Sequence, residues 1–209
     1  MHHVCLLYPV PKGGLLIWAE IYWQITAKLW PCSYSVSALR VVTLPEGVEE
    51  IGDYAFAYCV QLKTVVLPAS LTTLGKASFM GSSLETLHIA ETSRLSAISD
   101  WAFAECTKLS QINLPGNIKT VGVGSFFGCT GVNKIVLAEG VTSIGNLSFA
   151  NNTALAELTL PATLTNTDPR TDLAFTGAPV LYRENIHFPE GSTAESYVAN
   201  MVLNAKPKD

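Results

Sequence analysis

A pattern that recurs about every 23 residues constrains this chain more than any other feature of its sequence. Successive lines of the pattern are separated by 23, 22, 25, 23 and 23 residues, and they begin at Leu39, Leu62, Leu84, Leu109, Val132 and Leu155. This period is typical of proteins in which each line forms one coil of a solenoid. Because one coil cannot bury its own apolar side, such a chain folds only as an array of coils packed on one another.

Each line opens with alternating apolar and polar residues. The apolar positions, three and five residues after each start, are Val42 and Leu44, Val65 and Leu67, Leu87 and Ile89, Ile112 and Leu114, Ile135 and Leu137, Leu158 and Leu160. This alternation predicts a short strand with one buried face and one open face. Proline follows the strand in four lines, and it would end the strand because it cannot donate to the backbone ladder.

Two further columns recur later in each line. A glycine follows a second apolar pair in four lines, at Gly52, Gly75, Gly122 and Gly145, and Ser99 takes its place in the third line. We expect glycine there because a side chain would hinder a backbone turn. The last column is phenylalanine, at Phe56, Phe79, Phe103, Phe126, Phe149 and Phe175. One ring per coil predicts a continuous aromatic spine, in which each buried ring contributes roughly 1.5–3 kcal/mol.

Lines such as LRVVTLPEGVEEIGDYAFAYC and LSQINLPGNIKTVGVGSFFGC resemble the BspA-like leucine-rich-repeat family of bacterial and protist surface proteins. That family follows the pattern LxxIxLPxxVxxIGxxAFxxCxxL. The resemblance spans residues 39–175, and the sixth line departs from it because NTDPRTDLAFTG carries an insertion. It implies an α/β repeat fold: a right-handed leucine-rich-repeat solenoid with a parallel sheet on one face and short helical or irregular turns on the other. It also implies a cell-surface or secreted location.

The two ends of the chain do not follow the repeat. We therefore divide the chain into a non-repeat segment at 1–38, a solenoid of six repeats at 39–179, and a partial repeat with a helical cap at 180–209. The first segment is interpreted as an N-terminal cap, or alternatively as a remnant of a longer upstream protein. Its apolar stretches are too interrupted for a secretory signal or a transmembrane span. Residues 192–203 have a helical pattern with Ser192 or Thr193 as N-cap.

No motif for catalysis, phosphate binding or dinucleotide binding occurs in the chain. On a solenoid, His88 and His187 would lie four strands apart on the outward face, close to 20 Å at the usual strand spacing. That distance is too large for a shared metal or a catalytic pair. The sequence therefore predicts no enzyme activity, no metal and no cofactor. An enzyme would need acid and base groups gathered in one pocket.

Three of the five cysteines share one column, which Ser82 and Asn152 fill in two other lines. One interpretation is a disulfide or reactive pair between Cys106 and Cys129, because neighbouring coils bring Cα atoms within disulfide range. The interpretation we favour is that these thiols are small buried fillers, because the column accepts serine and asparagine and is thus defined by size.

The open face of the strands is the predicted binding surface, since solenoid strands arrange outward side chains in an ordered grid. The candidate binding residues are Thr64, Thr86, His88, Gln111, Asn113 and Lys134. The variable turns at 90–94 and 165–172 are an alternative site. A net charge of −4 with scattered basic residues excludes a nucleic-acid surface. We expect a monomeric, non-catalytic module that binds an extracellular protein or glycan, or alternatively a spacer within a larger surface protein.

Overall fold

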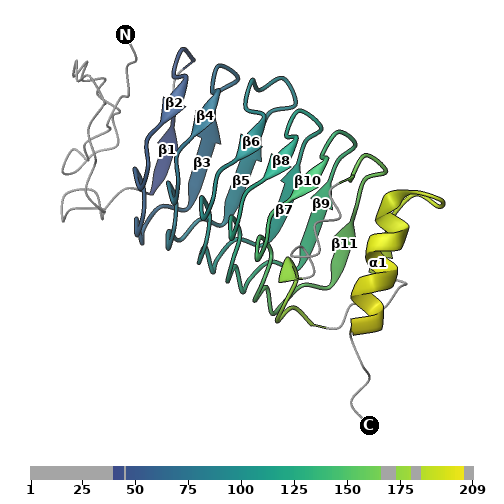
Figure 1. Cartoon of the computed structure of the whole chain (residues 1–209). Helices are drawn as coiled ribbons and strands as arrows, with labels where there is room; N and C mark the ends of the chain where they lie inside the picture. The colour runs from purple at the N-terminus through teal and green to yellow at the C-terminus, as the bar shows by residue number, and fades with distance from the viewer. Residues whose placement is uncertain (1–39, 45, 166–172, 180–184, 205–209) are drawn as a thin grey trace, which may run out of the picture.

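The computed structural model describes residues 40–44, 46–165, 173–179 and 185–204 as a parallel-sheet solenoid (Figure 1). Figure 1 shows the coils side by side, from β1 at one end to β11 and the helix α1 at the other. The fold predicted from the repeat is confirmed. The side opposite the strands is built from turns, and α1 is the one α-helix in the described part of the chain. The predictions for residues 1–38 lie outside the described residues, as does most of the sixth-line insertion.

The strand predicted at the start of each line is present and forms the first side of each coil. These strands are β1 (Val41–Thr43), β3 (Thr64–Leu67), β5 (Thr86–Ile89), β7 (Gln111–Leu114), β9 (Lys134–Leu137) and β11 (Glu157–Thr159), followed by β12 (Ile186–His187). Neighbours pair in parallel, with Val42 opposite Val65 and Ile112 opposite Ile135. Inward residues are buried and outward ones are open, as the alternation predicts.

A second, shorter parallel ladder forms the next side of each coil and was not predicted. Its two-residue strands are β2 (Glu50–Ile51), β4 (Thr73–Leu74), β6 (Ala97–Ile98), β8 (Thr120–Val121) and β10 (Ser143–Ile144). The second residue of each strand is the buried apolar residue just before the glycine column. Two residues are too few to produce a visible alternation, so the sequence pattern showed only an apolar position here.

Both ladders are interrupted on entering or leaving the third coil. The first ladder breaks between β5 and β7, and the second between β4 and β6. The third line is the longest, with two extra residues in the turn at 90–94. In this coil the inward residues Leu87 and Ile89 are only half-buried. The added turn therefore displaces this coil from regular pairing with its neighbours.

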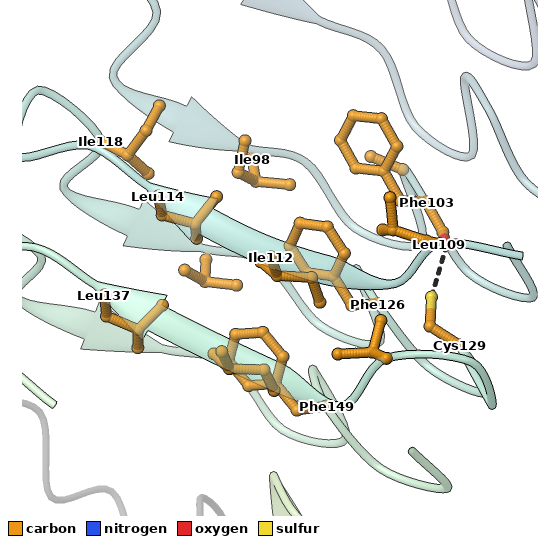
Figure 2. Packing of buried hydrophobic residues seen from close by; sticks show 14 of the residues in the cluster. Ile98, Phe103, Leu109, Ile112, Leu114, Ile118, Phe126, Cys129, Leu137 and Phe149 are labelled. Atoms are coloured by element: carbon orange, nitrogen blue, oxygen red, sulfur yellow. Dashed lines mark hydrogen bonds between the residues drawn. The ribbon is translucent and has the colours of Figure 1, made fainter. Parts of the chain in front are cut away.

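The predicted phenylalanine spine is confirmed (Figure 2). Successive ring centroids lie 5.0, 5.3, 5.3, 5.6 and 5.2 Å apart from Phe56 to Phe175, with interplanar angles of 16° or less. Separations of this size correspond to offset stacking. Phe175 joins the stack although its line carries the insertion. The insertion therefore leaves the spine continuous.

The turn around each phenylalanine forms a third side, with its own hydrogen bonds between coils. In the third coil the backbone N–H groups of Trp101, Phe103 and Glu105 donate to carbonyls of the fourth coil at 2.9, 2.8 and 2.7 Å. Trp101 and Glu105 have φ values of 60° and 59°. The same two columns, two residues before and after the phenylalanine, hold the other non-glycine residues with positive φ: Tyr54, Tyr58, Ala77, Leu147 and Asn151. Left-handed backbone thus recurs at defined positions in these turns.

The expectation that the glycine column sits in a strained turn is wrong. Gly52, Gly75, Gly122 and Gly145 do not adopt positive φ. Instead, coils approach too closely at this column for a side chain: a Cβ on Gly75 would lie 2.3 Å from the carbonyl carbon of Gly52. The exception, Ser99, lies in the coil where the ladder breaks, and its hydroxyl donates to the Leu74 carbonyl of the coil before.

The helix α1 (Thr193–Asn204) begins within one residue of its predicted start and packs on the last coil. Tyr197 and Val198 are buried, and the Tyr197 ring meets Phe175 edge-on at 6.5 Å. Within the solenoid, Gly47 and Gly140 donate their N–H groups to a hydroxyl of the following coil. At the equivalent Gly191, the N–H donates to Glu195 Oε2 of α1 at 2.9 Å. A helix side chain thus replaces the hydrogen bond of a further coil.

Cys106 and Cys129 are free, buried thiols, so the favoured interpretation is confirmed and the disulfide between them is not formed. Cys106 Sγ donates to the Phe79 carbonyl at 3.3 Å, and Cys129 Sγ donates to the Phe103 carbonyl at 3.1 Å (Figure 2). Each thiol therefore contacts the backbone of the preceding coil.

We expect neither thiol to be alkylated by iodoacetamide in the native protein at pH 8, and both to be alkylated in urea. Burial raises the pKa of Cys106 to about 12 and raises that of Cys129 well above its usual value, while the thiolate is the reactive form. Peptide mass spectrometry of labelled native and unfolded protein provides the measurement. Labelling of native Cys106 at the unfolded rate would show that this column is open to solvent.

Candidate binding face of the sheet

The six candidate binding residues lie on one face of the first sheet. Thr64 is on β3, Thr86 and His88 on β5, Gln111 and Asn113 on β7, and Lys134 on β9. Register places Thr64 opposite Thr86, and Gln111 opposite Lys134. The alternation of each strand turns these side chains outward because their neighbours Val65, Ile112 and Ile135 fill the core.

The histidines on this face are not a catalytic or metal pair. β7, β9 and β11 lie between His88 on β5 and His187 on β12, in agreement with the predicted four-strand separation. In the described part of the chain, no three His, Cys, Asp or Glu side chains are grouped to hold a metal ion. Nor does any described helix have the length and apolar character needed to cross a membrane.

Lys134 is engaged in an ion-pair cluster rather than free. Its Nζ lies 2.7 Å from Glu157 Oε1 on the next strand, and His187 Nε2 lies 3.8 Å from the same oxygen. The hydrogen bond from Lys134, with the charges of Lys134 and His187, outweighs partial burial and lowers the pKa of Glu157 below its usual 4.5. This cluster orders one end of the face, and a ligand would have to displace it to reach Lys134.

The lowered pKa of Glu157 predicts a pH-dependent contribution to stability. A depressed folded-state pKa stabilises the protein fully above the unfolded value near 4.5, and this stabilisation is lost as pH falls through the folded-state pKa. We therefore expect the stability difference between the wild type and Glu157→Gln to shrink as pH is lowered from 6 to below 4. Urea unfolding at each pH measures it, with the exposed Glu190→Gln as control. A difference that stays constant with pH would contradict the assigned pairing.

The centre of the face carries four exposed polar side chains without a partner. Thr86, His88, Gln111 and Asn113 make no side-chain hydrogen bond or ion pair with other residues of the described chain. By contrast, charges near both ends are paired, Lys63 with Glu85 at 2.7 Å and Lys134 with Glu157. The free quartet straddles the interruption between β5 and β7. Of the six candidates, these four are the most available to a ligand.

The alternative site in the 90–94 turn is held to its neighbours. Asn117 Nδ2 donates to the carbonyls of Ser93 and Leu95, both at 2.9 Å, and the Arg94 N–H donates to the Ala69 carbonyl. Ser93 is buried. This turn is therefore a packed part of the solenoid, while residues 166–172 of the other alternative lie outside the described residues.

An aromatic surface on the phenylalanine turns was missed by the sequence analysis. Tyr54 and Tyr58 are about half exposed in the first coil, and Trp101 meets Phe127 at 5.7 Å in the third and fourth. Each exposed ring covers a glycine of the next coil: a Cβ on Gly124 would lie 2.6 Å from the Trp101 ring. The signal was present as aromatic residues two positions from the phenylalanine column, but their orientation depends on the left-handed backbone.

The stacked coils, the parallel strands and the recurring leucine and phenylalanine columns define a leucine-rich-repeat protein. The model of the BspA type leucine rich repeat region, with six copies, matches residues 31–156 and 79–193. The chain belongs to this family.

Solved structures agree with this fold. A leucine-rich-repeat protein of T. pallidum is 22% identical, over 78% of this chain and 84% of that one, with a TM-score of 0.57. The pneumococcal vaccine antigen PcpA is 20% identical, over 77% of this chain and 43% of that one, with a TM-score of 0.59. No curated protein sequence matches the chain.

Proposed function

We propose that this protein is a non-catalytic binding module that recognises an extracellular protein or glycan through the open face of its first sheet. The observation that carries this proposal is the quartet of exposed, unpartnered polar side chains on β5 and β7. Ordered grids on solenoid sheets are well suited to binding because a rigid backbone spaces their side chains. A similar fold in a vaccine antigen supports a location at the cell surface.

A binding screen tests the proposal. The full chain is screened at physiological salt against extracellular-matrix proteins and a glycan array. We expect saturable binding that is lost in Thr86→Arg or Gln111→Arg, because a bulky charge would obstruct the face. Thr107→Arg is the matched control, since Thr107 is an exposed threonine of the same coil beyond the phenylalanine turn.

Two outcomes would contradict the proposal. Binding that survives the face variants but is lost in the control would place the working surface elsewhere on the solenoid. A folded, monomeric protein that binds nothing would instead favour the spacer hypothesis, in which the repeats separate other parts of a longer surface protein. The 43% coverage of PcpA is consistent with that alternative.

A further inference from the structure

The chemistry of the free quartet narrows the class of ligand. Threonine hydroxyls, carboxamides and neutral imidazole each offer a donor and an acceptor, and none of the four is a carboxylate, ammonium or guanidinium group. Neighbouring charges do not add a net field, because Lys63 is paired with Glu85 and Lys134 with Glu157. The centre of the face therefore presents uncharged hydrogen-bonding groups to solvent.

The flanking residues add small apolar contacts. Val66 lies opposite His88 and is 40% exposed, while the half-buried Val136 lies opposite Asn113. One outward column thus reads valine, histidine, asparagine, valine across four successive strands. Apolar contacts at both ends of a polar centre suit a ligand that exposes C–H groups as well as hydroxyls.

The residues missing from the face argue against a protein partner as the main ligand. Energetic hot spots of protein interfaces are rich in tryptophan, tyrosine and arginine. None of these occurs at the outward positions of β1, β3, β5, β7, β9, β11 and β12. An acidic polymer is likewise disfavoured, because the lysine within the face is already paired.

We infer that the ligand of this face is an uncharged oligosaccharide that lies across β5 and β7 and bonds to Thr86, His88, Gln111 and Asn113. Sugar hydroxyls both donate and accept, as the side chains of the quartet do. The interrupted ladder beneath the quartet separates β5 from regular pairing with β7. This inference rests on the proposed function and specifies its ligand.

An array that carries neutral oligosaccharides beside their sialylated and sulfated derivatives tests the inference with the full chain. We expect the neutral saccharides to bind, with little change between low and high salt because no ion pair forms. Titration calorimetry with the strongest neutral saccharide should show about tenfold weaker affinity for Gln111→Ala or Asn113→Ala, equivalent to about 1.4 kcal/mol. Thr43→Ala, in the same outward column on β1, should bind as the wild type does.

The outcomes separate this inference from the proposed function. Binding to acidic derivatives alone, or neutral-glycan binding unchanged in both alanine variants, would overturn the oligosaccharide assignment. Binding of a matrix protein through the same residues, without any glycan, would keep the proposed function and overturn the inference. The absence of any binding would overturn both. Circular dichroism checks that each exposed-site variant is folded.

Discussion

Replacing Phe126 with alanine should lower the free energy of unfolding by about 3–5 kcal/mol, the largest loss we expect from a single substitution. Phe126 is fully buried and stacks on Phe103 at 5.3 Å and on Phe149 at 5.6 Å. Truncation would remove both ring contacts and leave a cavity between two coils. Because each coil is stabilised only by its neighbours, damage in the middle of the array weakens both halves.

The adjacent residue provides a matched control for this prediction. Phe127 is half-buried and meets only Trp101 edge-on among the ring contacts, so Phe127→Ala removes the same atoms from a far less buried place. Urea denaturation followed by circular dichroism measures both variants. Equal losses for the two variants would show that the spine contributes no more than an exposed ring.

Replacing Gly75 with alanine should lower the free energy of unfolding by about 3 kcal/mol, at the upper end of overpacking costs. The added Cβ would lie 2.3 Å from the Gly52 carbonyl carbon and 2.4 Å from the Asp53 nitrogen. Both obstructing atoms belong to the backbone, so no side-chain rotation can relieve the contact. The two coils would have to separate, which would also strain the β2–β4 pairing.

Gly52→Ala tests the physical reason, because it places the same methyl group in the same column. Nothing lies within 4 Å of a Cβ at Gly52, and φ there is not positive. We therefore expect stability unchanged or raised by about 0.4–1 kcal/mol, because alanine restricts the unfolded chain. Urea midpoints of both variants decide the matter. A loss at Gly52 as large as that at Gly75 would mean that backbone conformation, rather than close approach, selects glycine.

The fold could be predicted from the sequence because each column repeats in almost every coil. The apolar positions of β3 and the rings of the spine are dictated by burial, which leaves a periodic mark on residue type. The second ladder left a weaker mark, because β4 and its equivalents are only two residues long. The limits of the terminal segments at 1–38 and 180–209 stay predictions.

The candidate site could be predicted only in part. Alternation placed Thr86 and Gln111 outward, as the structure has them. It did not indicate that Lys134 is held by Glu157, because the pair lies 23 residues apart in sequence and meets only across stacked strands. Nor did it reveal the exposed rings of Tyr58 and Trp101, whose direction depends on neighbouring residues with positive φ.

The repeated residue columns alone determined the solenoid, the direction of each strand residue and the aromatic spine, because hydrophobic burial imposes the same period on sequence and structure. Contacts between coils decided the rest. The close approach at Gly75, the ion pair at Glu157 and the interrupted ladder beside Thr86 each depend on how one coil is placed against the next. That placement is set by packing at atomic distances, which residue type in a single line does not encode.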